Sequence, residues 1–191
     1  MKDYIIRGAS IDESVRFFAC ITTNMVEEAR RIHDCYPVAT AALGRMLTAG
    51  CMMGTMLKSD RDTLTLQING KGPLGSIVVV SDNSGHTRGY VGNPQVETRT
   101  RENGKLDVGS AVGVDGVLTV IKDLGLKDPY IGTVPIVTGE IGDDLSAYFA
   151  SSEQTPTAVG LGVYVETDGR VSAAGGFIIQ LMPEADENTI S

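Results

Sequence analysis

The sequence has no tryptophan, only two histidines and three cysteines, and no long apolar run. Two histidines leave little room for a hydrolase triad, and the G-x-S-x-G nucleophile motif is absent. Cys20, Cys35 and Cys51 are widely spaced and odd in number, unlike a disulfide framework. No stretch reaches the roughly 18 apolar residues of a membrane span, and the first residues do not resemble a signal peptide. We therefore expect a cytoplasmic protein with no membrane association.

Positive charge is also scarce. The chain has 16 Lys and Arg against 24 Asp and Glu, which gives a net charge of −8 and a pI near 4.7. Basic residues cluster only at Arg30–Arg31 and at residues 99–101. Nucleic acid binding is not expected, because phosphate contacts need an extended basic patch. The composition, 42% hydrophobic and 21% charged, is that of an ordinary folded domain.

Glycine is abundant, at 23 of 191 residues. Together with many β-branched runs it predicts an α/β fold of the α+β type, with glycine-rich, mainly antiparallel sheets packed against a few helices. Strands are predicted at residues 15–22, 63–68, 76–80, 88–91, 116–124, 130–137, 157–166 and 169–182. The continuous apolar run 76–80 predicts a strand covered on both faces. Three segments, each a strand, a loop with Asp and Gly and a returning strand, predict recurrent hairpins.

Helical spacing predicts three helices. Asn24 and Glu27 form a candidate capping box for residues 25–33, and Pro37 suits the first turn of a helix that reaches about Leu57. An acidic first turn opens a short helix that ends at Ala150. The second helix is rich in Met, Ala and Gly. Its methionines predict either core packing or a partner-binding surface: Met46, Met52, Met53 and Met56.

The glycine motifs do not predict a nucleotide site. Residues 70–75, GKGPLG, match G-x-G-x-x-G, but that fingerprint requires a following helix, and a strand is predicted instead. We expect a tight turn between two strands. Gly109, Gly113 and Gly116 predict a bend or bulge rather than an anion site.

A cysteine-dependent enzyme is the main catalytic alternative, with Cys35 or Cys51 acting beside His33. Neighbouring residues on a helix point in different directions, so the sequence His33-Asp34-Cys35 is not a preassembled dyad. The cysteines lack C-x-x-C spacing. We therefore predict no catalytic residue, no cofactor site and no metal site in this chain. A self-assembling structural module is a further alternative.

Five stretches in order along the chain carry a family resemblance: TNMVEEARRIHDCYPVATAALGRMLTAG, INGKGPLGSIVVVSDNSGHTRGYVGNPQV, VIKDLGLKDPYIGTV, GEIGDDLSAYFASSEQTPTAVGLGVYV and AAGGFIIQLMP. The set resembles the 33 kDa chaperonin family, the redox-regulated bacterial holdase chaperones. The resemblance implies ATP-independent binding of unfolded client proteins under oxidative or heat stress, and a homodimer.

The same resemblance implies a domain organisation. Residues 1–182 would be the N-terminal chaperone body, and residues 183–191 the start of a linker. The C-terminal zinc and redox domain, with its C-x-C and C-x-x-C cysteines, is expected to be absent from this chain, so no zinc ligand or redox residue is assigned here. In this context the four methionines become a candidate client or dimer surface.

Overall fold

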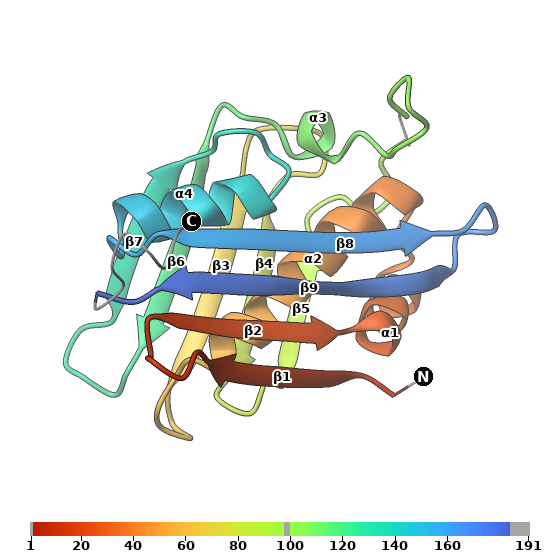
Figure 1. The fold of residues 1–191 in the computed structure, drawn as a ribbon. Coiled ribbons are helices and arrows are strands. Elements are labelled where there is room, and N and C mark those ends of the chain that lie inside the picture. The colour runs from red at the N-terminus through yellow and green to blue at the C-terminus, as the bar shows by residue number, and fades with distance from the viewer. Residues whose placement is uncertain (1, 98–99, 184–191) are drawn as a thin grey trace.

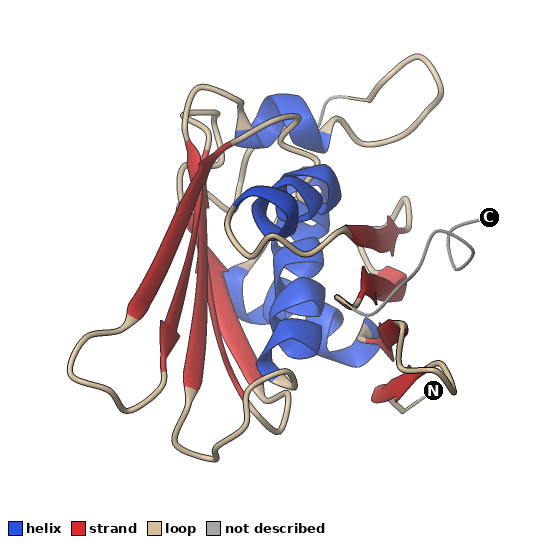
Figure 2. Ribbon diagram, turned by 60° about the vertical axis from the view of Figure 1, so that its left-hand side comes forward, coloured by secondary structure: helices blue, strands red, loops and turns tan. Residues whose placement is uncertain are grey.

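The computed structural model describes residues 2–97 and 100–183, which form two antiparallel sheets with helices between them (Figures 1 and 2). Sheet A has the order β1-β2-β9-β8 and sheet B the order β5-β4-β3-β6-β7. The strands of sheet A are β1 (Tyr4–Ala9), β2 (Val15–Ile21), β9 (Val171–Leu181) and β8 (Thr157–Val165). Those of sheet B are β5 (Thr87–Val91), β4 (Ile77–Asp82), β3 (Thr63–Asn69), β6 (Val117–Asp123) and β7 (Tyr130–Pro135). The helices are α1 (Thr23–His33), α2 (Pro37–Gly54), α3 (Val108–Val112) and α4 (Gly142–Ser151).

Helix α2 is the centre of the core, because it contacts strands of both sheets. A helix that is apolar on all sides is stable only when it is buried on all sides. Small residues allow the close approach: a Cβ added at Gly44 would lie 2.6 Å from Val26 Cγ1, and one at Gly50 would lie 2.7 Å from Val79 Cγ1. The two sheets therefore pack on opposite sides of one helix, as Figure 2 shows.

The predicted fold class is confirmed, and so are the three hairpins. β4 pairs with β5, β6 with β7, and β8 with β9, each in antiparallel register. The turn after β3 leads into β4 and not into a helix, as expected for the GKGPLG stretch. Gly70 and Gly72 lie against the backbone of Val112 and Gly113, where any side chain would clash.

Four local features differ from the predictions. β1 was not anticipated; it forms by pairing with β2. Helix α1 begins at Thr23 without a capping box, because the carboxylate of Asp3 accepts hydrogen bonds from the Asn24 and Met25 amides instead, at 3.0 and 2.8 Å. The glycine-rich segment after residue 107 begins with helix α3, whose N-cap is Asp107. β4 is covered on one face only, since its residues alternate between buried and half-buried.

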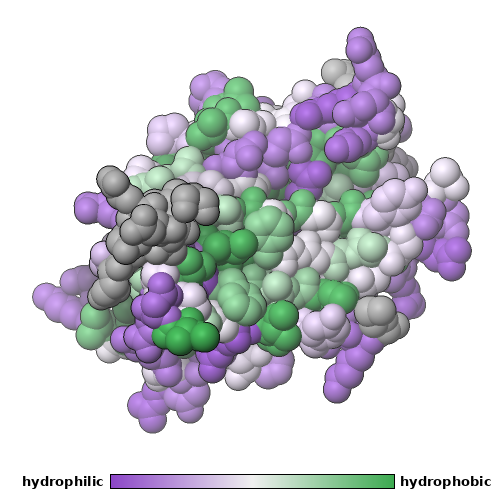
Figure 3. All heavy atoms as spheres, in the orientation of Figure 1, coloured by the Kyte–Doolittle hydropathy of each residue, from purple (hydrophilic) through white to green (hydrophobic). Residues whose placement is uncertain are grey.

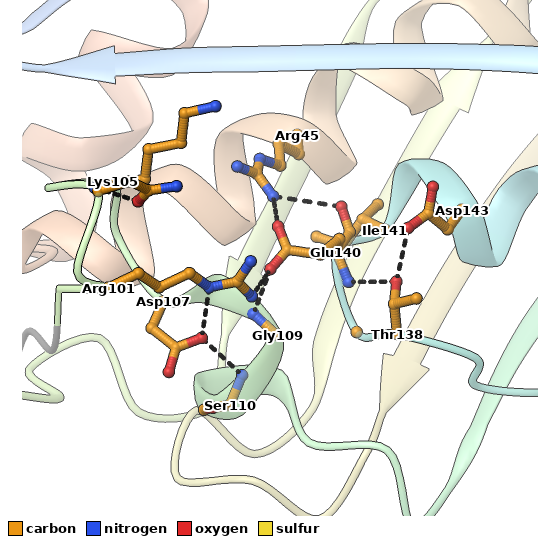
Figure 4. A network of polar contacts seen from close by, with 12 residues as sticks. Arg45, Arg101, Lys105, Asp107, Gly109, Ser110, Thr138, Glu140, Ile141 and Asp143 are labelled. Atoms are coloured by element: carbon orange, nitrogen blue, oxygen red, sulfur yellow. Dashed lines mark hydrogen bonds and ion pairs between the residues drawn. The ribbon is translucent and has the colours of Figure 1, made fainter.

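A polar network fixes the loops at one end of the molecule (Figure 4). Glu140 Oε2 accepts a hydrogen bond from Arg45 Nη1 of α2 at 2.6 Å, and its Oε1 accepts from the Gly109 amide at 3.1 Å. Arg101 binds both Glu140 and Asp107. Charge-assisted hydrogen bonds of this kind are stronger than neutral ones. The network holds α2, α3 and the segment before α4 together. These polar groups therefore stabilise the fold.

Candidate functional site

The outer face of sheet A, the face turned away from α2, is the most unusual surface of the described residues. Residues paired across antiparallel strands share one face of a sheet. The register pairs Ile6 with Ala19, Phe17 with Ile179 and Gly160 with Phe177. Phe18, Cys20 and Ile178 are buried on the other side. The outer face is thereby defined as Tyr4, Ile6, Gly8, Val15, Phe17, Ala19, Ile21, Ala158, Gly160, Gly162, Tyr164, Ala173, Gly175, Phe177, Ile179 and Leu181.

No residue of this face carries a charge, and its large side chains reach solvent. Ile6 is 52% exposed, Phe177 44% and Ile179 41%. Figure 3 shows the face directly, with hydrophobic and weakly polar residues in the middle and hydrophilic residues around the rim. Contiguous exposed apolar surface with a polar rim marks an interaction site in soluble proteins.

Aromatic rings cover the sheet backbone at two places. The ring of Phe17 lies over Gly8, so that an added Cβ there would lie 2.8 Å from the ring, and the ring of Phe177 lies over Gly160 in the same way. Aromatic residues often cover glycines of neighbouring strands and restore packing there. Each ring therefore packs across a neighbouring strand and covers its backbone with apolar surface.

A groove lies on the outer face of sheet A where strands β2 and β8 end. It has a volume of about 620 Å³, and Ile21, Gly162, Tyr164, Ala173 and Gly175 are among its lining residues. No atom lies within 4 Å of the position that a Cβ of Gly162 would occupy, so the floor is open. The volume lies in the range of ligand pockets, and it would hold several apolar side chains of a bound segment.

The methionines occupy a different place from this surface. Met46, Met52 and Met53 are fully buried in the core between the sheets, while Met56 is half-buried. The prediction that the methionines form a client or dimer surface is therefore wrong for the first three, which follow the alternative of core packing. The physical reason is that both sides of α2 are covered by a sheet. For Met56, a role in a client or dimer surface stays a prediction.

The cysteine enzyme alternative finds no support in the geometry. No hydrogen bond joins His33 to Cys35 or Cys51 in the described part of the chain. Burial raises the pKa of the Cys35 thiol to about 11, which disfavours the nucleophilic thiolate.

Cys51 has a different partner, the buried thiol of Cys20. The neighbouring Cys51 thiol raises the pKa of Cys20, and burial adds to that effect. The Cys20 thiol lowers the pKa of Cys51, and burial opposes that effect. Sequence spacing does not indicate this pair, because the two residues belong to different elements, β2 and α2.

No group of three or more His, Cys, Asp or Glu side chains in residues 2–97 and 100–183 could hold a metal ion. None of the described helices combines the length and the apolarity of a membrane span. The location of a zinc site elsewhere in a longer protein stays a prediction.

Comparison with known proteins identifies the family of this chain. A family model described as Hsp33 protein matches residues 3–191. The chain belongs to the Hsp33 family. The 33 kDa chaperonin of Clostridium beijerinckii is 57% identical over 187 residues, which cover 98% of this chain and 64% of that protein. The 33 kDa chaperonin of Clostridioides difficile is 56% identical over 191 residues, which cover 100% of this chain and 65% of that protein.

A solved Hsp33 structure confirms the fold. The crystal structure of the 33 kDa chaperonin from Thermotoga maritima superposes with a TM-score of 0.87 at 45% identity, over 93% of this chain and 60% of that chain. This Hsp33-family chain therefore spans less than two thirds of the length of these relatives. The predicted linker start, residues 183–191, falls almost entirely outside the described residues.

Proposed function

We propose that this chain is the client-binding body of an ATP-independent holdase chaperone, and that it holds unfolded proteins on the outer face of sheet A. The observation that carries the proposal is the combination of an uncharged, exposed apolar sheet face with membership of the Hsp33 family. Unfolded chains expose apolar side chains, and burial of such surface is worth about 25 cal/mol per Å². A broad face of this kind binds many sequences, because apolar burial is non-directional.

Several further features belong to the same proposal. Activity without ATP agrees with the GKGPLG turn, which leads into β4 and leaves no helix N-terminus for a phosphate. Redox regulation and zinc are assigned to the part of the relatives that lies beyond this chain. A homodimer in the cytoplasm, active under heat or oxidative stress, completes the proposed role.

The test is suppression of client aggregation, followed by light scattering of a thermally unfolding protein with this chain added. Ile179→Asp places a charge in the middle of the outer face, between Phe17 and Ala158. Thr119→Asp is the matched control on the outer face of sheet B, between Gln67 and Thr133. We expect Ile179→Asp to raise the chain concentration needed for half suppression by about 10-fold, since an apolar side chain contributes about 1.5–3 kcal/mol when buried. The control should act like the unchanged chain.

Two results would contradict the proposal. Equal suppression by both variants would place the client elsewhere on the molecule. Unchanged scattering with the unmodified chain would show that the body does not bind clients by itself.

A further inference from the structure

Helix α2 ends before the inner face of sheet B does. Gly54, the last residue of α2, lies against Ser81 of β4, since a Cβ at Gly54 would lie 2.4 Å from Ser81 Oγ. Ser81 pairs with Leu64 of β3, and Leu64 pairs on its other side with Lys122 of β6. Side chains two positions further toward this end of the sheet share the inner face but lie beyond the helix. The end of this face is therefore not covered by α2.

A pocket with a volume of about 310 Å³ lies at this uncovered end. The end of α2, helix α4, the end of β6 and the segment before β3 contribute its lining residues: Met53, Met56, Leu57, Lys58, Asp62, Lys122, Leu124 and Phe149. Met53 and Phe149 are buried, whereas Met56 and Leu57 are half-buried. The apolar walls and the volume, at the lower end of the usual range, are those of a pocket for a small molecule.

Three charged side chains line the pocket, and two of them have partners within the fold. The Lys122 ammonium forms an ion pair with the carboxylate of Glu153. Asp62 is buried, and its Oδ2 accepts a hydrogen bond from the Ser59 amide at 3.1 Å. The exposed Lys58 ammonium makes no ion pair or hydrogen bond with any residue in 2–97 and 100–183. The charge that is available to a ligand at this pocket is therefore positive.

We propose that this pocket binds a small amphipathic anion, a carboxylate that carries an aliphatic chain of medium length. The chain lies against Met53, Met56 and Phe149, and the carboxylate lies beside Lys58. Burial of the chain supplies most of the affinity, because each buried methylene group contributes to it. Methionine side chains are flexible and adapt to a ligand of irregular shape. The ammonium of Lys58 donates charge-assisted hydrogen bonds to the carboxylate, which selects an anion over a neutral ligand.

The pocket is separate from the outer face of sheet A, because none of its lining residues belongs to a strand of that sheet. This inference therefore does not rest on the proposed client binding, and either can fail without the other. It also gives Met56 a role other than the client or dimer surface that the sequence predicts.

The experiment titrates the whole chain, labelled with carbon-13 at its methionine methyl groups, with decanoate and follows the methyl signals by NMR. Met53 and Met56 report on the pocket, Met46 on the core two helical turns earlier in α2, and Met182 on the end of sheet A. Single Met→Leu variants assign the signals. We expect saturable shifts at Met53 and Met56 below the concentration at which decanoate forms micelles, and smaller shifts at Met46 and Met182.

A change of head group tests the charge. Decanol and decylammonium have the same chain without the negative charge, and both should bind at least about 3-fold more weakly than decanoate. Lys58→Gln should weaken decanoate binding by about 3-fold and leave decanol binding unchanged. Lys127→Gln is the matched control, because Lys127 is exposed in the loop between β6 and β7 and does not line the pocket. It should change the binding of neither probe.

A change in the wall tests the apolar part of the pocket. Leu124→Ala shortens a partly exposed wall residue and should weaken decanoate and decanol alike, by about 5-fold. Leu126→Ala, in the same loop, removes an exposed side chain that does not line the pocket and should change neither affinity.

Three results from the unchanged chain would overturn the proposal. Shifts at Met182 without shifts at Met53 and Met56 would place the ligand on sheet A. The absence of any saturable shift would show that the pocket binds no such ligand. Equal or tighter binding of decanol or decylammonium would show that the pocket does not select an anion.

Discussion

The outer faces of the two sheets differ in chemistry although both are exposed antiparallel surfaces over the same helix. On sheet A the outer face is apolar throughout. On sheet B the outward positions include Thr65, Gln67, Thr119 and Thr133 together with Val and Ile, and the hydroxyls of Thr119 and Thr133 lie 3.2 Å apart. An antiparallel sheet with one face on the core normally presents polar residues on the other. Sheet B follows this pattern, and sheet A does not.

This contrast does not come from the packing of the core. Both sheets bury their inner faces against α2, so the requirements of the core explain neither outer face. Threonine has the shape and β propensity of valine and adds a hydroxyl for water. Sheet B uses it where sheet A keeps Phe17, Phe177 and Ile179. The apolar residues of sheet A are therefore not needed for strand formation, which supports a binding role.

The largest effect on stability should come from shortening a side chain on the buried face of sheet A, compared with its neighbour on the outer face. Ile178 is buried and Ile179 is 41% exposed, although they are neighbours on β9. Ile178→Ala should lower the free energy of unfolding by about 2–5 kcal/mol, because it removes buried methyl groups and leaves a cavity. Ile179→Ala should cost about 1 kcal/mol or less. Urea unfolding followed by circular dichroism measures both. Equal losses would mean that the outer face is part of the folding core.

A smaller effect should come from the glycines under the aromatic rings. Gly160→Ala would push the Phe177 ring off the sheet and should lower stability by about 1 kcal/mol. Gly162→Ala, two residues further along β8, meets no neighbouring atom and should raise stability by about 0.5 kcal/mol through lower chain entropy. Thermal unfolding of the pair gives the comparison. A Gly160→Ala variant as stable as Gly162→Ala would show that the ring adds nothing to sheet A.

Much of this fold was predictable from period and turn chemistry. The Asp168-Gly169 turn between two apolar runs predicted the β8–β9 hairpin, which forms as expected. Strand β1 was missed because Tyr4–Ala9 is a short edge segment with Arg7 and Gly8 inside it. Its pairing with β2 supplies what local propensity does not.

The outer face itself could not be found from alternation. On β2 Phe17 and Phe18 point to opposite sides, and on β9 Ile178 and Ile179 do the same, so both alternate sets contain large apolar side chains. A period of two then gives no difference between inside and outside. Only the position of α2 decides which set is buried. The methionines of α2 were wrongly predicted to form a surface for a related reason. An apolar helix without a polar face indicates burial on all sides.

The smallest effect should come from making sheet B resemble sheet A. Thr119→Val combined with Thr133→Val removes two hydroxyls beside Ile121 and Ile131 and keeps the side-chain shape. Stability should change by no more than about 0.5 kcal/mol, because the positions reach solvent. Binding of an apolar fluorescent dye should rise, and Thr119→Ser with Thr133→Ser serves as the control that keeps the hydroxyls. The double valine variant is then combined with Ile179→Asp, which disables the outer face of sheet A. If this combined variant binds the dye but no clients, apolar character alone does not make a client surface. The glycines of sheet A, and the aromatic rings that cover two of them, would then be the features that distinguish its outer face.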